Sequence, residues 1–130
     1  QEVIDDSIPT PNEIKRVVLC SGKLYYDLKD YREANGIQSV AVIRLEQLYP
    51  FPEKALHAIK KRYQSAKSWV WAQEEPKNMG AWWYLSQSLT TVIQSVECVA
   101  RKVSASPAAG NAKTHAKEQN QLIESAFKGV

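Results

Sequence analysis

The chain has 130 residues, of which 44% are hydrophobic and 24% charged, and its formal net charge is +3. This length suits one domain that buries roughly two thirds of the surface of its unfolded chain, and no apolar run approaches the roughly 18 residues of a membrane span. The basic residues are scattered among carboxylates, without the dense stripe typical of a nucleic-acid-binding surface. We therefore expect a globular domain with no role in a membrane or on nucleic acid.

Residues 1–14 have the composition of a linker. They include Pro9, Pro11 and several acidic residues, and they lack the basic and apolar regions of a targeting peptide. We expect an interdomain linker or an extended strap over a neighbouring domain. The domain itself is then expected to span residues 15–130, as a piece of a longer polypeptide.

Two strand–helix pairs follow this segment. Residues 16–20 form an apolar run of strand length, and Ser21 is placed to cap a helix that ends at Gly36. Residues 40–45 are almost continuously apolar, as expected of a strand covered on both faces. A helix over residues 53–63 follows. Its expected inward face is Leu56, Ile59 and Tyr63.

Two further pairs complete the pattern, with strands over residues 68–72 and 97–103 and a helix over residues 80–95. A loop of small residues, 104–111, leads into the terminal helix. The alternation predicts an α/β fold, a three-layer sandwich around a mostly parallel sheet. The expected inward residues of the last two helices are Trp82, Leu85, Leu89, Val92 and Val96, and then Leu122, Ile123, Ala126 and Phe127.

The segment Gln-Glu-Glu-Pro-Lys-Asn-Met-Gly-Ala-Trp-Trp-Tyr, residues 73–84, carries the strongest functional signal. Two carboxylates, Glu74 and Glu75, end an apolar strand, and Pro76 removes a backbone donor where the ladder is expected to stop. Gly80 then opens a helix. Because the carboxyl ends of parallel strands share one edge, where ligands gather, we expect this loop at the working edge of the sheet. The loops expected beside it are 21–23, 46–52 and 104–111.

Each of these features has a structural alternative. Glu74 and Glu75 could act as paired acid and base, or they could serve a domain or subunit contact. The turn at 21–23 could bind phosphate at a helix N-terminus, or it could only cap the helix. The four tryptophans are expected to pack rather than to stack on a ligand. They are Trp69, Trp71, Trp82 and Trp83.

Self-contained catalytic or metal chemistry is not predicted. His57 and His115 have no second ligand at metal-binding spacing, and no nucleophile–base motif is present. Cys20 and Cys98 lie in apolar runs and are expected to be buried thiols rather than a disulfide. We therefore predict no catalytic residue and no metal site within the chain.

Ordered blocks of sequence resemble a known family. They are Leu-Cys-Ser-Gly-Lys-Leu-Tyr-Tyr-Asp-Leu, Arg-Leu-Glu-Gln-Leu-Tyr-Pro-Phe-Pro, residues 73–84, Ser-Ala-Ser-Pro-Ala-Ala-Gly, and residues 113–127 with His115. In this order they resemble the last domain of the thiamine-diphosphate-dependent E1 component of 2-oxoglutarate dehydrogenase. The resemblance implies a transketolase C-terminal-domain-like fold. It also implies an oxidoreductase that decarboxylates 2-oxoglutarate and passes the succinyl group to the lipoyl arm of the E2 component, in the tricarboxylic acid cycle.

The resemblance further implies where the cofactor and partners lie. Thiamine diphosphate and magnesium would be held by preceding domains of a homodimer, and this domain would brace that dimer. The loop residues Glu74, Glu75, Asn78 and Gly80 are then expected at a domain or subunit contact. The implied location is the cytoplasm of a bacterium or the mitochondrial matrix of a eukaryote.

A regulatory pocket is also implied, because some relatives bind acetyl-CoA or a nucleotide such as AMP. They use a glutamine of the Glu-Gln-Leu block and two successive basic residues after the Pro-x-Pro turn. The matching positions are Gln47 and Lys54, but Ala55 stands at the second basic position. This departure removes one phosphate contact.

Two other function classes remain open from the residues themselves. One is a free-standing flavodoxin-like nucleotide-binding domain, which predicts ligand binding by the isolated chain but lacks a glycine-rich phosphate loop. The other is a structural interaction module without a ligand.

Overall fold

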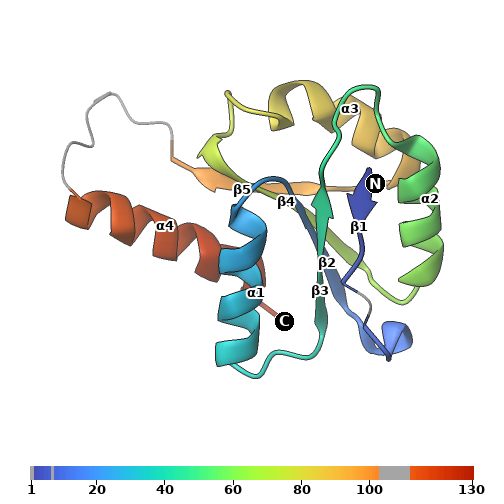
Figure 1. Ribbon diagram of the computed structural model, residues 1–130, viewed down its shortest axis with the longest axis horizontal. Coiled ribbons are helices and arrows are strands. Elements are labelled where there is room, and N and C mark those ends of the chain that lie inside the picture. The colour runs from blue at the N-terminus through green and yellow to red at the C-terminus, as the bar shows by residue number, and fades with distance from the viewer. Residues whose placement is uncertain (1, 7, 103–111) are drawn as a thin grey trace.

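The protein is an α/β sandwich in which a five-stranded sheet lies between two pairs of helices (Figure 1). The computed structural model describes residues 2–6, 8–102 and 112–130. The strands are β1 (Val3–Ile4), β2 (Arg16–Cys20), β3 (Val40–Leu45), β4 (Ser68–Pro76) and β5 (Glu97–Arg101). The helices are α1 (Leu24–Ala34), α2 (Glu53–Arg62), α3 (Trp82–Val92) and α4 (Ala112–Phe127), with a short 3-10 turn, η1, at Pro11–Glu13.

The sheet has the order β1-β3-β2-β4-β5. Strands β2 to β5 are parallel, and only β1 runs antiparallel, against β3. Val18 of β2 lies opposite Val42 on one side and Val70 on the other. The chain thus moves outward from β2 in both directions, and β2 and β4 flank the switch point of the topology. The predicted mostly parallel α/β fold is confirmed.

Alternate strand residues fill two separate cores, because successive side chains of a strand point to opposite faces. One core joins the sheet to α2 and α3 through residues such as Leu19, Ile43 and Trp71. The other joins it to α1 and α4 through Val18, Val42 and their neighbours. The predicted inward residues of α2 and of the terminal helix are buried. They are Leu56, Ile59, Tyr63, Leu122, Ile123, Ala126 and Phe127.

Two predicted boundaries are wrong. Helix α1 begins at Leu24 after Lys23, which has no side-chain capping bond, so Ser21 is not its cap. Gly22 has a φ of +67°, a left-handed turn that separates the strand from the helix. Strand β4 continues beyond residue 72 to Pro76, because the ladder with β5 resumes after a register shift and Pro76 lies opposite Arg101.

The predicted third helix is also corrected. Helix α3 spans Trp82–Val92, so Val96 lies outside it. Trp69 and Trp71 are buried as expected, Trp82 is half-buried, and Trp83 is 74% exposed. The helix begins two residues later than predicted, and the interpretation of Trp83 as a packing residue is wrong.

The first residues of the chain pack on this same sheet. Val3 and Ile4 extend the sheet beside β3. The carboxylate of Asp6 accepts hydrogen bonds from the guanidinium of Arg32 and from the Val42 amide. The domain boundary at residue 14 stays a prediction. Of the helices described, none combines the length and the apolar character that a membrane crossing requires.

Candidate functional site

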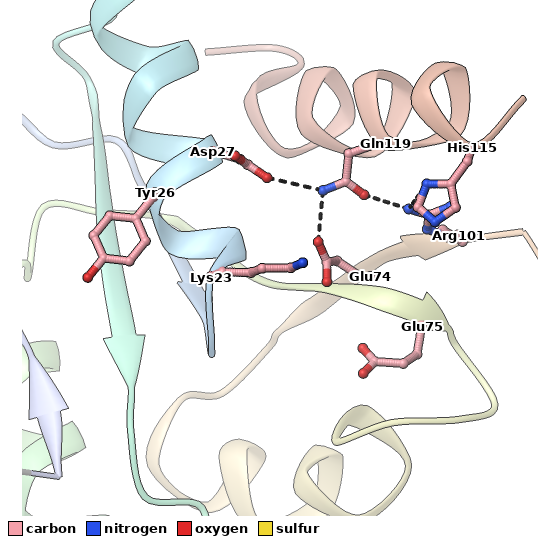
Figure 2. A pocket seen from close by; sticks show the side chains of 8 residues that line it. All are labelled: Lys23, Tyr26, Asp27, Glu74, Glu75, Arg101, His115 and Gln119. Atoms are coloured by element: carbon pink, nitrogen blue, oxygen red, sulfur yellow. Dashed lines mark hydrogen bonds between the residues drawn. The ribbon is translucent and has the colours of Figure 1, made fainter. Parts of the chain in front are cut away.

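An open cavity lies at the carboxyl edge of the sheet, beside the switch point between β2 and β4. Its volume is about 730 Å³. Figure 2 shows the side chains of Asp27, Glu74, Arg101 and Gln119, from α1, β4, β5 and α4, pointing toward one another beside it. The lining residues are Lys23, Tyr26, Asp27, Glu74, Glu75, Arg101, His115 and Gln119. Ligands of open α/β sheets commonly occupy this position.

A chain of hydrogen bonds links side chains that line the cavity. The Arg101 guanidinium donates to Gln119 at 2.6 Å and contacts the Glu118 carboxylate at 3.2 Å. The Gln119 amide donates in turn to Glu74 at 2.9 Å and to Asp27 at 3.3 Å. These bonds join α1, β4, β5 and α4, so the cavity wall is built by residues far apart in sequence.

The two predicted carboxylates have different surroundings. Glu74 points toward Gln119 and accepts its hydrogen bond, whereas Glu75 points away from this network (Figure 2). Both line the cavity. Glu74 is thus held in a network that joins α1, β4, β5 and α4, and this arrangement favours a structural role for Glu74.

The loop after β4 is held by Gln73, which is only 4% exposed. Its side-chain oxygen accepts hydrogen bonds from the Trp71 indole and the Trp82 amide, both at 2.9 Å. Its nitrogen donates to the carbonyls of Pro76 and Met79, at 2.8 and 2.9 Å. The residue was not singled out from the sequence. The available signal was an amide directly after a buried strand, where a polar side chain must find partners.

Gly80 closes the same loop. Its φ is +67°, and a Cβ at this position would lie 3.1 Å from the Glu75 side chain. Glycine therefore meets both a backbone and a packing requirement. Asn78 is exposed on the loop. Of the four predicted contact residues, Glu74 and Glu75 line the cavity, while Asn78 and Gly80 are exposed and do not line it.

The predicted regulatory residues lie elsewhere on the edge. Gln47 and Lys54 are exposed, on the connection after β3 and in the first turn of α2. The Gln47 amide donates to the Tyr49 carbonyl at 3.4 Å. Ala55 is half-buried and packs against the α2–α3 core. The cavity of about 730 Å³ is lined by other residues, so the role of Gln47 and Lys54 stays a prediction.

The remaining reactive groups are poorly suited to covalent catalysis. Burial raises the pKa of the Cys20 thiol to about 12 and that of Cys98 to about 11, so both are protonated near neutral pH. Both cysteines are free. Across residues 2–6, 8–102 and 112–130, no three His, Cys, Asp or Glu side chains lie close enough together to hold a metal ion.

Fold and site together define the class: a transketolase-like α/β domain with its loops gathered at the carboxyl edge of the sheet. A solved structure of a split-gene transketolase, described as an inactive beta4 tetramer, has a similar fold, with a TM-score of 0.55 and 14% sequence identity. The match covers 87% of this chain and 39% of the transketolase chain. At that identity the likeness concerns the fold alone.

The chain belongs to the family described as 2-oxoglutarate dehydrogenase C-terminal, whose model matches residues 1–127. The 2-oxoglutarate dehydrogenase E1 component of Azotobacter vinelandii is 43% identical over 123 residues, and that of Haemophilus influenzae 46% over 120. Each alignment covers 90% of this chain but 13% of the relative. The Rickettsia felis protein of the same name is 45% identical over 122 residues, covering 89% of this chain and 12% of its own. The chain thus spans a small part of these relatives.

Proposed function

We propose that this chain acts as the C-terminal domain of an E1 enzyme that decarboxylates 2-oxoglutarate and transfers the succinyl group to lipoyl-E2. The observation that carries the proposal is the family match over residues 1–127, with 43–46% identity to E1 components over 90% of the chain. These relatives are bacterial, which supports a cytoplasmic location. The family membership replaces the free-standing flavodoxin-like alternative.

This chain matches only 13% of its E1 relatives, so most of the full enzyme lies outside it. Among the described residues, no group of three or more His, Cys, Asp or Glu side chains could hold a metal ion. We therefore assign the cofactor to other parts of the full polypeptide and derive no chemical step within this domain. When bound, the cofactor supplies the electron sink for decarboxylation.

The domain's own contribution is to present the loop of residues 73–82 in one fixed form. Gln73 fastens the loop from beneath, and Gln119 ties its first residue, Glu74, to α1 and α4. A pre-ordered loop loses little conformational freedom when it meets a partner surface. We place this loop at a contact with the preceding E1 domains or with the second subunit of a homodimer.

The test uses the full-length polypeptide that contains this chain. Purified with thiamine diphosphate and magnesium, it is expected to release carbon dioxide from 2-oxoglutarate and to succinylate a lipoyl domain of E2. Pyruvate serves as the matched substrate control. Turnover of pyruvate without turnover of 2-oxoglutarate would contradict the substrate assignment.

We also propose that Gln47 and Lys54 form a weak site for acetyl-CoA or AMP. The support is their exposure on neighbouring turns at one edge of the sheet. In the full-length enzyme, Ala55→Arg is expected to tighten binding, since a charged hydrogen bond contributes about 1.5–3 kcal/mol, or roughly tenfold or more in affinity. The aliphatic part of the introduced arginine side chain must first lie along the apolar surface that Ala55 now covers. Calorimetry on the parent, Ala55→Arg and Lys54→Ala proteins decides; absence of binding by all three would remove the site.

A further inference from the structure

Three large apolar side chains lie exposed at the start of α3: Met79, Trp83 and Tyr84, together called the 79–84 patch. Among the described residues six large hydrophobic side chains are exposed, and this patch holds three of them. Trp83 is 74% and Met79 58% exposed. Concentrated apolar exposure of this kind marks interaction surfaces in folded proteins.

The backbone beneath the patch is already ordered. Gln73 bonds the Met79 carbonyl on one side and the Trp82 amide on the other. The Tyr84 amide donates to the Ala81 carbonyl at 3.2 Å, which begins the helix. The surface is therefore preformed, because the backbone that carries these side chains is held by hydrogen bonds.

The surroundings resemble the anatomy of a protein interface, with an apolar centre and a polar rim. Glu75, Lys77 and Asn78 are exposed on the preceding turn. A tryptophan that becomes buried usually finds an acceptor for its indole N–H. The complementary surface is thus apolar and offers a hydrogen-bond acceptor near its centre.

The path of the chain indicates what covers the patch. Strand β1 runs antiparallel to β3, and the amides of Glu46 and Gln47 both donate to the Glu2 carbonyl, at 2.9 and 3.3 Å. Residue 2 therefore lies at the carboxyl edge of the sheet, the edge from which the loop after β4 also projects (Figure 1). The family is a C-terminal one, and the relatives extend far beyond the matched 13%. Sequence preceding residue 1 thus joins the domain at the same edge of the sheet as the patch, separated from β4 by the two strands β3 and β2, and as part of the same polypeptide it is present at high effective concentration.

We propose that the 79–84 patch is the docking surface for the part of the same polypeptide that precedes residue 1, through an apolar face that accepts a hydrogen bond from Trp83. This deepens the proposed function, on which it rests for the existence of a longer chain. It also identifies the apolar residues, rather than the carboxylates Glu74 and Glu75, as the centre of the contact.

The first experiment measures hydroxyl-radical oxidation of the full-length chain by mass spectrometry, native and unfolded in urea. Trp83 and Met79 are expected to lose nearly all their oxidation in the native chain. Tyr49 is the matched control, because it is an exposed aromatic outside the patch, 88% accessible, and it should oxidise similarly in both states. Oxidation of native Trp83 to the same extent as in the unfolded chain would overturn the docking surface.

The second experiment identifies the occupant. A photoreactive benzoylphenylalanine replaces Trp83 in the full-length protein, and the products are separated on a denaturing gel. An intramolecular cross-link that keeps the mass of one chain and maps to peptides preceding residue 1 supports the proposal. A product of twice that mass would assign the patch to a second subunit and overturn it.

The docking surface and the E1 activity can be contradicted independently of each other. Protection and intramolecular cross-linking of Trp83 without 2-oxoglutarate turnover would support the docking surface and remove the E1 activity. Normal turnover of 2-oxoglutarate with an exposed Trp83 would support the E1 activity and remove the docking surface.

Discussion

At the residue scale, one buried polar side chain, Gln73, holds the loop after β4 in place. Gln73 makes contacts on both sides of its amide group, to an indole, a backbone amide and loop carbonyls. Removing the Gln73 amide would therefore leave several polar groups without partners at once, and each unpaired group lowers the free energy of unfolding.

Replacing Gln73 with leucine tests this role. Gln73→Leu keeps the approximate volume but leaves the Trp71 indole and the Trp82 amide without their acceptor. We expect a loss of unfolding free energy of about 1–3 kcal/mol per unsatisfied group, measured by denaturant titration of the 130-residue chain. Gln87→Leu, at an exposed position of α3, should change stability by less than about 0.5 kcal/mol. Equal denaturation midpoints for Gln73→Leu and Gln87→Leu would contradict the role of Gln73 in holding the loop.

Two tryptophans provide a second, internally controlled prediction. Trp71 is fully buried in the core between the sheet and α2–α3, whereas Trp83 is exposed. Trp71→Ala should cost about 3–5 kcal/mol of unfolding free energy, and Trp83→Ala in the isolated chain less than about 0.5 kcal/mol. The same titration measures both. A large loss for Trp83→Ala would mean that this ring packs within the domain.

At the element scale, β1 depends on side-chain contacts as well as on its short ladder. A two-residue strand contributes few backbone hydrogen bonds, and Asp6 adds bonds to Arg32 and to the Val42 amide of the neighbouring strand. Asp6 is almost fully enclosed and pairs with Arg32. Removing one member of an enclosed ion pair is strongly unfavourable.

Asp6→Asn is therefore expected to loosen the first strand. The substitution removes the charge that Arg32 faces, so the amides of Val42 and Glu46, which bond to Asp6 and Glu2, should exchange hydrogen faster. Amide exchange followed by mass spectrometry or NMR measures this. Asp30→Asn is the control, because it makes the same charge change at an exposed position of α1. Unchanged exchange at both amides would show that the ladder alone holds β1.

At the scale of the whole molecule, the chain matches only a small part of its E1 relatives, 13% of the Azotobacter vinelandii and Haemophilus influenzae proteins. The 130-residue chain is expected to release no carbon dioxide from 2-oxoglutarate when supplied with thiamine diphosphate, magnesium and a lipoyl domain as acceptor, because it matches only 13% of its E1 relatives. Carbon dioxide release in a radiometric assay measures this, with the full-length protein as the positive control. Turnover by the short chain would contradict the assignment of the cofactor to other domains.

Much of the fold was predictable because it depends on local pattern. Strands β2 and β3 match the predicted ranges, since each is a continuous apolar run between turn residues. The inward faces of α2 and α4 follow from helical period. Strand β1 was missed, because two residues carry no periodic signal, and β4 was ended too early at Ala72, because a register shift with a distant strand is not a local property.

The candidate site divides in the same way. The motif around Glu74, Glu75 and Gly80, and the family it indicates, depend on residue identities in order, which the chain carries by itself. The hydrogen-bond partners of those residues do not follow from the order of residues. Glu74 meets Gln119 across 45 positions, and Asp27 meets it across 92, so only the packing of α1 and α4 on one face of the sheet brings them together. The exposure of Trp83 was likewise decided by tertiary structure, because the turn that begins α3 sets which of two adjacent indoles faces the core.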